Sequence, residues 1–132
     1  MLECLILGDS IAVGTHMFRP DCVAYAKGGI NSWQWVNQHI TKDLTAKSVI
    51  ISLGSNDHKG VKTEEELRTI RRLTKADRVY WILPAINPNI QEIVKKIAAE
   101  YKDTVVPITR LQPDGIHPSW AGYKEIAVVT KN

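Results

Sequence analysis

Residues 2–10 read LECLILGDS, an apolar run of strand length that ends in glycine, aspartate and serine. Four further runs of this kind follow, at residues 22–26, 49–53, 79–83 and 104–108. The runs are apolar on both faces, as expected of strands in a sheet that helices cover on both sides. Helical patterns lie between them, so the sequence predicts an α/β domain with a parallel sheet.

Two segments between the runs carry clear helical signals. Residues 90–101, IQEIVKKIAAEY, place apolar side chains at i, i+3, i+4 and i+7. Residues 63–76, TEEELRTIRRLTKA, begin with Thr63 and Glu66 in a capping-box pattern. Among the tryptophans, Trp81 lies in an apolar run and Trp33 shares a helical face with Val36 and Ile40, so both are predicted to be core residues.

Length and composition bound the class of protein. The 132 residues predict a single domain spanning 1–132, and a formal net charge of +3 without concentrated basic blocks argues against nucleic-acid binding. The first apolar run is too short for a leader or a membrane span and has no basic segment before it, which predicts a cytoplasmic protein without a membrane span. Cys4 and Cys22 are predicted to be buried free thiols in a reducing compartment.

Short polar blocks follow the predicted strands: GDS at 8–10, KGGINS at 27–32, GSND at 54–57 and PDGIHP at 113–118. Ligands in open α/β sheets bind beyond the carboxyl ends of the strands, where these blocks lie. Each block alone is typical of a turn or a helix cap. The last block differs because glycine and two prolines oppose a helix while an acid and a histidine stand three residues apart.

Together and in this order, the four blocks resemble the SGNH hydrolase family, the GDSL-type esterases and lipases. The resemblance covers almost the whole chain: GDSIAVG contains Ser10, KGGINS contains Gly29, GSND contains Asn56, and DGIHP contains Asp114 and His117. It implies a flavodoxin-like, three-layer α/β/α fold with a five-stranded parallel sheet in the order 2-1-3-4-5. It also implies serine-dependent hydrolysis of carboxylic esters without a cofactor or a metal.

The resemblance assigns Ser10, His117 and Asp114 as the catalytic triad, and the chemistry requires such a set. A serine hydroxyl is a poor nucleophile at neutral pH, so Ser10 needs an adjacent base, for which the imidazole of His117 is suited. Asp114 can accept the other ring N–H and stabilise the imidazolium that forms.

The tetrahedral intermediate of ester cleavage needs preorganised hydrogen-bond donors for its oxyanion. The resemblance assigns the Ser10 N–H, a glycine N–H and the Asn56 amide to this oxyanion hole. Gly29 is preferred over Gly28 because Asn31 and Ser32 follow it as the short polar pair that family members carry.

Other residues near the blocks receive supporting roles. Asp9 and Asp57 are interpreted as supports of the loops that carry Ser10 and Asn56. His58 is interpreted as a surface loop histidine. Trp35 and Trp120 are possible substrate contacts, because aromatic faces beside the serine could hold an acyl chain or a sugar ring.

Little sequence separates the blocks, which predicts a shallow, open site. This favours a small-molecule or carbohydrate ester as the substrate, such as an O-acetyl group on a polysaccharide. Three alternatives stay open: a glycan- or peptidoglycan-acting enzyme on the same fold, a non-catalytic binding module, and a phosphoryl-transfer domain with Asp9 as the acceptor. The sequence leaves the oligomeric state open.

Overall fold

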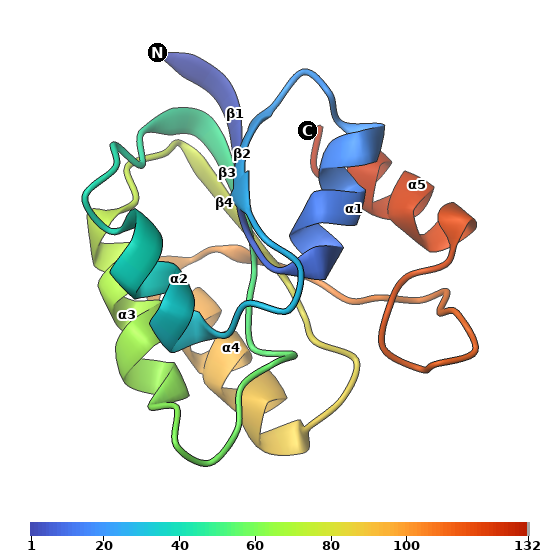
Figure 1. The fold of residues 1–132 in the computed structure, drawn as a ribbon. Helices are drawn as coiled ribbons and strands as arrows, with labels where there is room; N and C mark the ends of the chain where they lie inside the picture. Colours follow the sequence, from blue (N-terminus) through green and yellow to red (C-terminus); the bar gives the residue numbers. More distant parts are fainter. Residues whose placement is uncertain (132) are drawn as a thin grey trace.

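The computed structural model describes residues 1–131 and alternates strands with helices along the chain (Figure 1). The strands are β1 (Leu2–Gly8), β2 (Val23–Ala26), β3 (Ala46–Ser52), β4 (Arg78–Ile82) and β5 (Thr104–Val106). The helices are α1 (Ser10–Phe18), α2 (Ser32–His39), α3 (Thr63–Leu73), α4 (Pro88–Tyr101) and α5 (Trp120–Val129). Each predicted apolar run forms a strand, and the two predicted helices form α3 and α4.

All neighbouring strands pair in parallel, in the order β2-β1-β3-β4-β5. The predicted order of the five-stranded sheet and the three-layer α/β/α architecture are therefore confirmed. The chain runs from β1 to β2 on one side and then returns to place β3 on the other side of β1. Such a reversal opens a crevice at the carboxyl ends of the strands, where ligands bind in this class of fold.

The core lies in two layers, one on each face of the sheet. In β1, Leu5 and Leu7 pack into the layer covered by α2, α3 and α4, whereas Cys4 and Ile6 pack into the layer covered by α1 and α5. Successive side chains of a strand point to opposite faces, which explains why an unbroken apolar run serves both layers. Each fully buried leucine or isoleucine contributes roughly 1.5–3 kcal/mol to stability.

Gly8 ends β1 at a point where the backbones of two strands approach closely. A Cβ atom at this position would lie 1.9 Å from the carbonyl oxygen of Ser52, and the φ angle of +148° is one that side chains disfavour. The next amide, that of Asp9, donates to the same Ser52 carbonyl at 3.0 Å. Glycine at this position therefore allows the chain to leave β1 tightly against β3 and enter α1 directly.

The predictions for the two tryptophans of α2 are wrong, because the exposure of Trp33 and Trp35 is the reverse of what was predicted. Trp35 is fully buried in the core and its Nε1–H donates to the carbonyl of Tyr25 at 2.9 Å, whereas Trp33 is 56% exposed. Asn31 caps the helix, which ends at His39, so Ile40 lies at the C-cap and does not extend a Trp33 face. Trp35 is consequently no substrate contact. The predicted core position of Trp81 is confirmed.

The start of α3 also differs from the capping-box prediction. Thr63 is the first residue of the helix, and the preceding Lys62 occupies the N-cap without a side-chain hydrogen bond. The Thr63 hydroxyl instead donates to Asp57 Oδ2 at 2.8 Å. The Thr63 hydroxyl therefore bonds to the side chain of Asp57 in another loop, whereas the capping-box pattern predicted a bond to the helix backbone.

Cys4 and Cys22 form a disulfide, so the prediction of free thiols is wrong. Leu5 pairs with Val23 in the β1–β2 register, which places the two preceding residues side by side with Cα atoms 4.6 Å apart. Disulfides persist in oxidising surroundings, and the sequence-based argument for a reducing compartment no longer holds.

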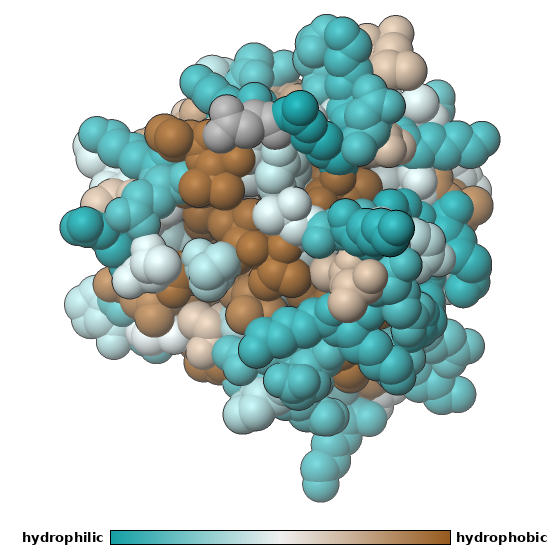
Figure 2. All heavy atoms as spheres, turned by 180° about the vertical axis from the view of Figure 1, so that it is seen from behind, coloured by the Kyte–Doolittle hydropathy of each residue, from teal (hydrophilic) through white to brown (hydrophobic). Residues whose placement is uncertain are grey.

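Part of the molecular surface is apolar. Figure 2 shows hydrophobic side chains gathered in a band on the face opposite to that of Figure 1. An apolar cavity of about 150 Å³ lies between the edge strand β5 and helix α5, with Val106, Ile126 and Val129 in its lining. Within residues 1–131, no helix combines the length and apolar character that crossing a bilayer requires.

Candidate active site

Ser10 and His117 meet at the carboxyl edge of the sheet although 107 positions separate them in sequence. Ser10 is the first residue of α1, directly after β1, and His117 lies in the loop between β5 and α5. Ser10 Oγ is 2.8 Å from His117 Nε2, and His117 Nδ1 is 2.6 Å from Asp114 Oδ2. The structure thus brings the three predicted triad residues into one hydrogen-bonded line.

The protonation of this line follows from the state of Asp114. Hydrogen bonds from the Ile116 amide, from the His117 ring and from the His117 amide lower the pKa of Asp114 to about 2. The ionised carboxylate accepts only, so His117 Nδ1 carries the proton. When the ring carries this one proton, Nε2 is the acceptor and the Ser10 hydroxyl donates to it. This is the arrangement in which imidazole can remove the serine proton.

The loop at residues 111–118 holds Asp114 and His117 without a helix. Asp114 Oδ1 accepts from the amides of Ile116 and His117 at 2.9 and 3.0 Å, which turns the chain back on itself. The Gln112 amide donates to the His117 carbonyl at 2.8 Å, and the Gln112 side chain donates to the Pro118 carbonyl at 3.0 Å. A turn that the Asp114 carboxylate caps therefore places Asp114 and His117 side by side, three residues apart in sequence.

Residues 27–30 form a tight turn beside Ser10. The Ile30 amide donates to the Lys27 carbonyl at 3.3 Å, and Gly29 has a φ angle of +78°, as the third residue of a type II turn requires. A Cβ built on Gly28 would lie 3.9 Å from Ser10 Cβ, whereas one built on Gly29 would meet nothing within 4 Å. The turn therefore presents exposed glycine backbone next to the serine.

Asn56 and Asp57 lie in the loop after β3 and fasten the neighbouring loops. Asn56 Nδ2 donates to the Ile30 carbonyl at 3.0 Å, which orients an amide that carries a second N–H. Asp57 Oδ1 accepts from the Ser32 amide at 2.9 Å, and its Oδ2 accepts from Thr63. Asp57 thus joins the starts of α2 and α3 around Asn56.

Asp9 is fully buried behind Ser10. Its Oδ1 accepts from the Ile11 amide at 3.0 Å and from the Ser52 hydroxyl at 3.1 Å, so it caps α1 and ties it to β3. Burial raises the pKa of Asp9 to about 6, against the lowering effect of these hydrogen bonds. Sequence reasoning missed Ser52 because its only signal is a polar residue at the end of an apolar run.

The site is open to solvent. The side chains of His117 and Asp114 are about one-third and two-fifths exposed. Trp120 begins α5 and is 72% exposed, with its ring edge against Phe18 at a centroid distance of 5.7 Å. His58 is exposed, and its Nδ1 accepts from the Gly60 amide at 3.0 Å within its own loop. The shallow site expected from the short loops agrees with these exposures.

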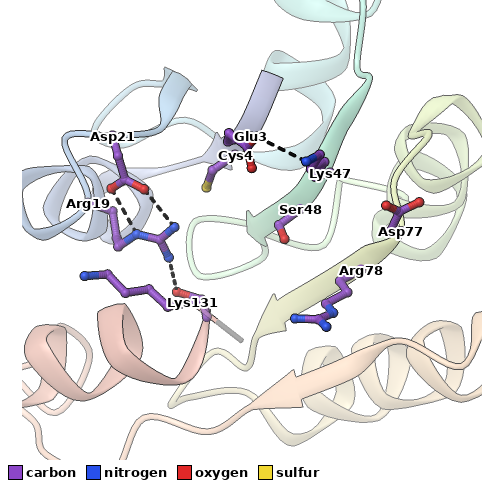
Figure 3. A pocket seen from close by; sticks show the side chains of 10 residues that line it. Glu3, Cys4, Arg19, Asp21, Lys47, Ser48, Asp77, Arg78 and Lys131 are labelled. Carbon is purple, nitrogen blue, oxygen red and sulfur yellow. Dashed lines mark hydrogen bonds and ion pairs between the residues drawn. The ribbon is translucent and has the colours of Figure 1, made fainter. Parts of the chain in front are cut away.

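A separate polar cavity of about 590 Å³ lies at the opposite, amino-terminal edge of the sheet (Figure 3). Arg19 pairs with Asp21 at 3.1 Å and donates to Thr130, and Lys47 pairs with Glu3 at 3.3 Å. Arg19 is also the C-cap of α1, where a cation offsets the partial negative charge of the helix end. These charges satisfy local structural needs, far from Ser10.

Comparisons with family models and with curated proteins find no match. Among solved structures, a GDSL-like lipase from Bacteroides thetaiotaomicron is 18% identical with a TM-score of 0.69, over 98% of this chain and 86% of that one. A protein assigned as an acylhydrolase, from Bacteroides fragilis, is 19% identical with a TM-score of 0.67, over 98% and 85%. The catalytic domain of Streptococcus pneumoniae peptidoglycan O-acetyltransferase A is 17% identical with a TM-score of 0.62, over 96% and 88%. The chain therefore adopts the fold of the SGNH hydrolases.

Proposed function

We propose that this chain is a serine acylhydrolase that cleaves a carboxylic ester. The observation that carries the proposal is the hydrogen-bonded line from Ser10 through His117 to Asp114, with distances of 2.8 and 2.6 Å. A serine hydroxyl without such a base is a weak nucleophile at neutral pH, and an adjacent base activates it. The likeness to GDSL-like lipases adds the support of a shared fold.

In the proposed reaction, Ser10 Oγ attacks the ester carbonyl while its proton passes to His117 Nε2. Asp114 stabilises the resulting imidazolium through the Nδ1–H bond. The tetrahedral intermediate collapses, the alcohol leaves with the proton from Nε2, and the acyl group stays on Ser10. Water then attacks the acyl-enzyme by the same route, which releases the acid and regenerates the serine.

The negative oxygen of the intermediate requires donors on the side of Ser10 that faces the turn at residues 27–30. We assign this role to the Ser10 N–H at the start of α1, the Gly29 N–H, and the second N–H of Asn56. The bond from Asn56 to the Ile30 carbonyl supports this assignment, because a preoriented donor stabilises the oxyanion without reorganising during the reaction.

The substrate class follows from the open site. Exposed His117 and Asp114 leave no deep enclosure for a long acyl chain, so we propose a small acyl group, such as an O-acetyl group on a carbohydrate. The phosphoryl-transfer alternative is disfavoured because the Asp9 carboxyl is fully buried and bonded to Ile11 and Ser52. A non-catalytic binding module would not require the Ser10–His117–Asp114 line.

The test is active-site labelling combined with turnover. A fluorophosphonate probe should label the wild type and hydrolysis of p-nitrophenyl acetate should be measurable, while Ser10→Ala should lose both. Ser48→Ala changes a serine at the opposite edge of the sheet and should retain both activities. Absence of labelling and hydrolysis in the wild type would reject the proposal, as would full activity in Ser10→Ala.

Acyl transfer to an alcohol is the second candidate, favoured by the likeness to the peptidoglycan O-acetyltransferase domain. Both reactions share the acyl-Ser10 intermediate and differ in whether water or a sugar hydroxyl attacks it. Mass spectrometry of products formed with and without an added oligosaccharide acceptor separates them. Acetylated acceptor at the expense of free acetate indicates a transferase, and free acetate alone indicates a hydrolase.

A further inference from the structure

Trp33 is an exposed aromatic residue at the start of α2, where several hydrogen bonds fix the backbone. The residue is 56% exposed and lies on the first turn of α2. The Asn31–Gln34 capping box fixes the helix start, the Ser32 amide is bonded to Asp57, and the Asn37 side chain donates to the Trp33 carbonyl at 2.8 Å. These bonds fix the backbone that carries Trp33, and the exposed indole offers a broad apolar face with one N–H donor to a ligand.

The indole borders a cavity of about 300 Å³ between α2 and the start of α3, which lie next to each other in Figure 1. Besides Trp33, the cavity is lined by Gly60, Lys62, Glu65 and Glu66. Lys62 supplies hydrogen-bond donors, and the two carboxylates supply acceptors. The cavity therefore combines one broad apolar face with charged groups at its rim.

Residues 28–33 connect the turn beside Ser10 to the first turn of α2. Gly28, Gly29 and Trp33 are exposed along this segment, whereas Ile30 and Ser32 are buried. Gly28 lies against Ser10, and Trp33 is four residues beyond Gly29, which limits the separation of their Cα atoms to about 14 Å. The same segment is held to the loop that carries Asn56 by the Asn56–Ile30 bond of 3.0 Å. One extended ligand can therefore lie at Ser10 and reach Trp33.

We propose that Trp33 and this cavity form a saccharide subsite, in which a sugar ring of an oligosaccharide ester stacks on the indole while the acyl group lies at Ser10. This inference rests on the proposed esterase function and specifies its substrate class. A sugar ring has an apolar C–H face for the indole and hydroxyl groups for Lys62 and the glutamates. A long acyl chain would leave the charged rim without partners, and a nucleic-acid phosphate would be repelled by Glu65 and Glu66.

The first experiment measures binding without chemistry. Xylotetraose, cellotetraose and N-acetylchitotetraose are titrated into wild type, Ser10→Ala, Trp33→Ala and Leu73→Ala, the last being an exposed apolar side chain at the far end of α3. We expect at least one sugar to bind wild type, Ser10→Ala and Leu73→Ala equally and to bind Trp33→Ala at least tenfold more weakly. Trp33→Phe should recover part of the affinity.

The subsite is rejected if none of the three sugars binds the wild type, or if Trp33→Ala binds as tightly as Leu73→Ala. Circular dichroism of each variant shows whether the fold is retained. Partial recovery by Trp33→Phe identifies the aromatic face itself as the binding element.

The second experiment compares two esters. Trp33→Ala should lower kcat/KM for acetylated xylotetraose about tenfold, mainly by raising KM, and leave hydrolysis of p-nitrophenyl acetate unchanged, because the small ester does not reach the subsite. Equal losses on both esters would reject the inference. If the wild type cleaves neither ester, the proposed function fails, and the sugar-binding result alone decides the subsite.

Discussion

Replacing Asp9 by asparagine should change how the stability of the protein depends on pH. Asp9 is fully buried, and its Oδ2 has no hydrogen-bond partner among residues 1–131. Burial raises its pKa to about 6 from 3.8, and this difference corresponds to about 3 kcal/mol of unfavourable free energy for the ionised form.

The sign of the effect follows from proton binding. The native state holds the Asp9 proton more tightly than the unfolded chain does, so the native state alone carries it between about pH 4 and pH 6. Stability from this group is therefore fully present below pH 4 and is lost as the pH rises to 6. The amide of the Asp9→Asn variant has no proton to lose in this range. The free energy of unfolding of Asp9→Asn should therefore rise relative to wild type by about 3 kcal/mol between pH 4 and pH 7.

Urea denaturation at pH 4, 5, 6 and 7 measures this difference directly. The substitution also changes the hydrogen bonds to Ile11 and Ser52, which shifts the free energy of unfolding by an amount that does not depend on pH. Comparing how the free energy of unfolding changes with pH in the two proteins removes this constant shift. Asp43→Asn, which alters an exposed carboxyl, is the control and should run parallel to wild type. Parallel curves for Asp9→Asn and wild type would refute the assignment of a buried, proton-binding Asp9.

Four further predictions concern the site and the fold. Asn56→Ala should lower kcat for p-nitrophenyl acetate by about 10² to 10³ without changing stability greatly; an unchanged kcat would remove Asn56 from the oxyanion hole. Asp114→Asn should lower kcat by between about 10² and 10⁴, because the amide cannot hold the His117 tautomer, and pre-steady-state kinetics would show whether acylation is the slowed step. Gly8→Ala should destabilise the protein by about 3 kcal/mol or more in urea, since the new methyl group would overlap a backbone carbonyl of β3. Removing the Cys4–Cys22 disulfide, which closes a separation of 18 residues, should cost about 3 kcal/mol, and mass spectrometry of the alkylated protein reports whether the bond is present.

The resemblance in four short blocks singles out Ser10, His117 and Asp114 as the candidate triad without any knowledge of their geometry. The blocks could be recognised because each follows a strand, and the carboxyl ends of parallel strands meet at one edge. The distance of 2.8 Å between Ser10 and His117 could not be derived in this way, because it depends on how the loop after β5 folds back toward α1. The turn built on Asp114 Oδ1 provides that return.

Where sequence reasoning failed, side chains had partners far away in the sequence. Thr63 fits a capping box locally, yet its hydroxyl bonds to Asp57. Trp33 and Trp35 differ by two positions on one short helix, and contact with the sheet decided which of them was buried. Cys4 and Cys22 stand in separate strands, and their pairing depends on the β1–β2 register.

Apolar periodicity and short polar blocks are local properties of the chain. The periodicity was enough to predict the alternation of strands and helices and the parallel sheet, and the resemblance of the blocks to the SGNH hydrolase family implied the candidate site residues Ser10, Gly29, Asn56, Asp114 and His117. Three other properties could be known only from the packed molecule: Asp9 is buried with a raised pKa, the two cysteines are bonded, and Trp33 faces solvent. Each of these depends on contacts between segments that are distant in the sequence and that only the folded sheet brings together.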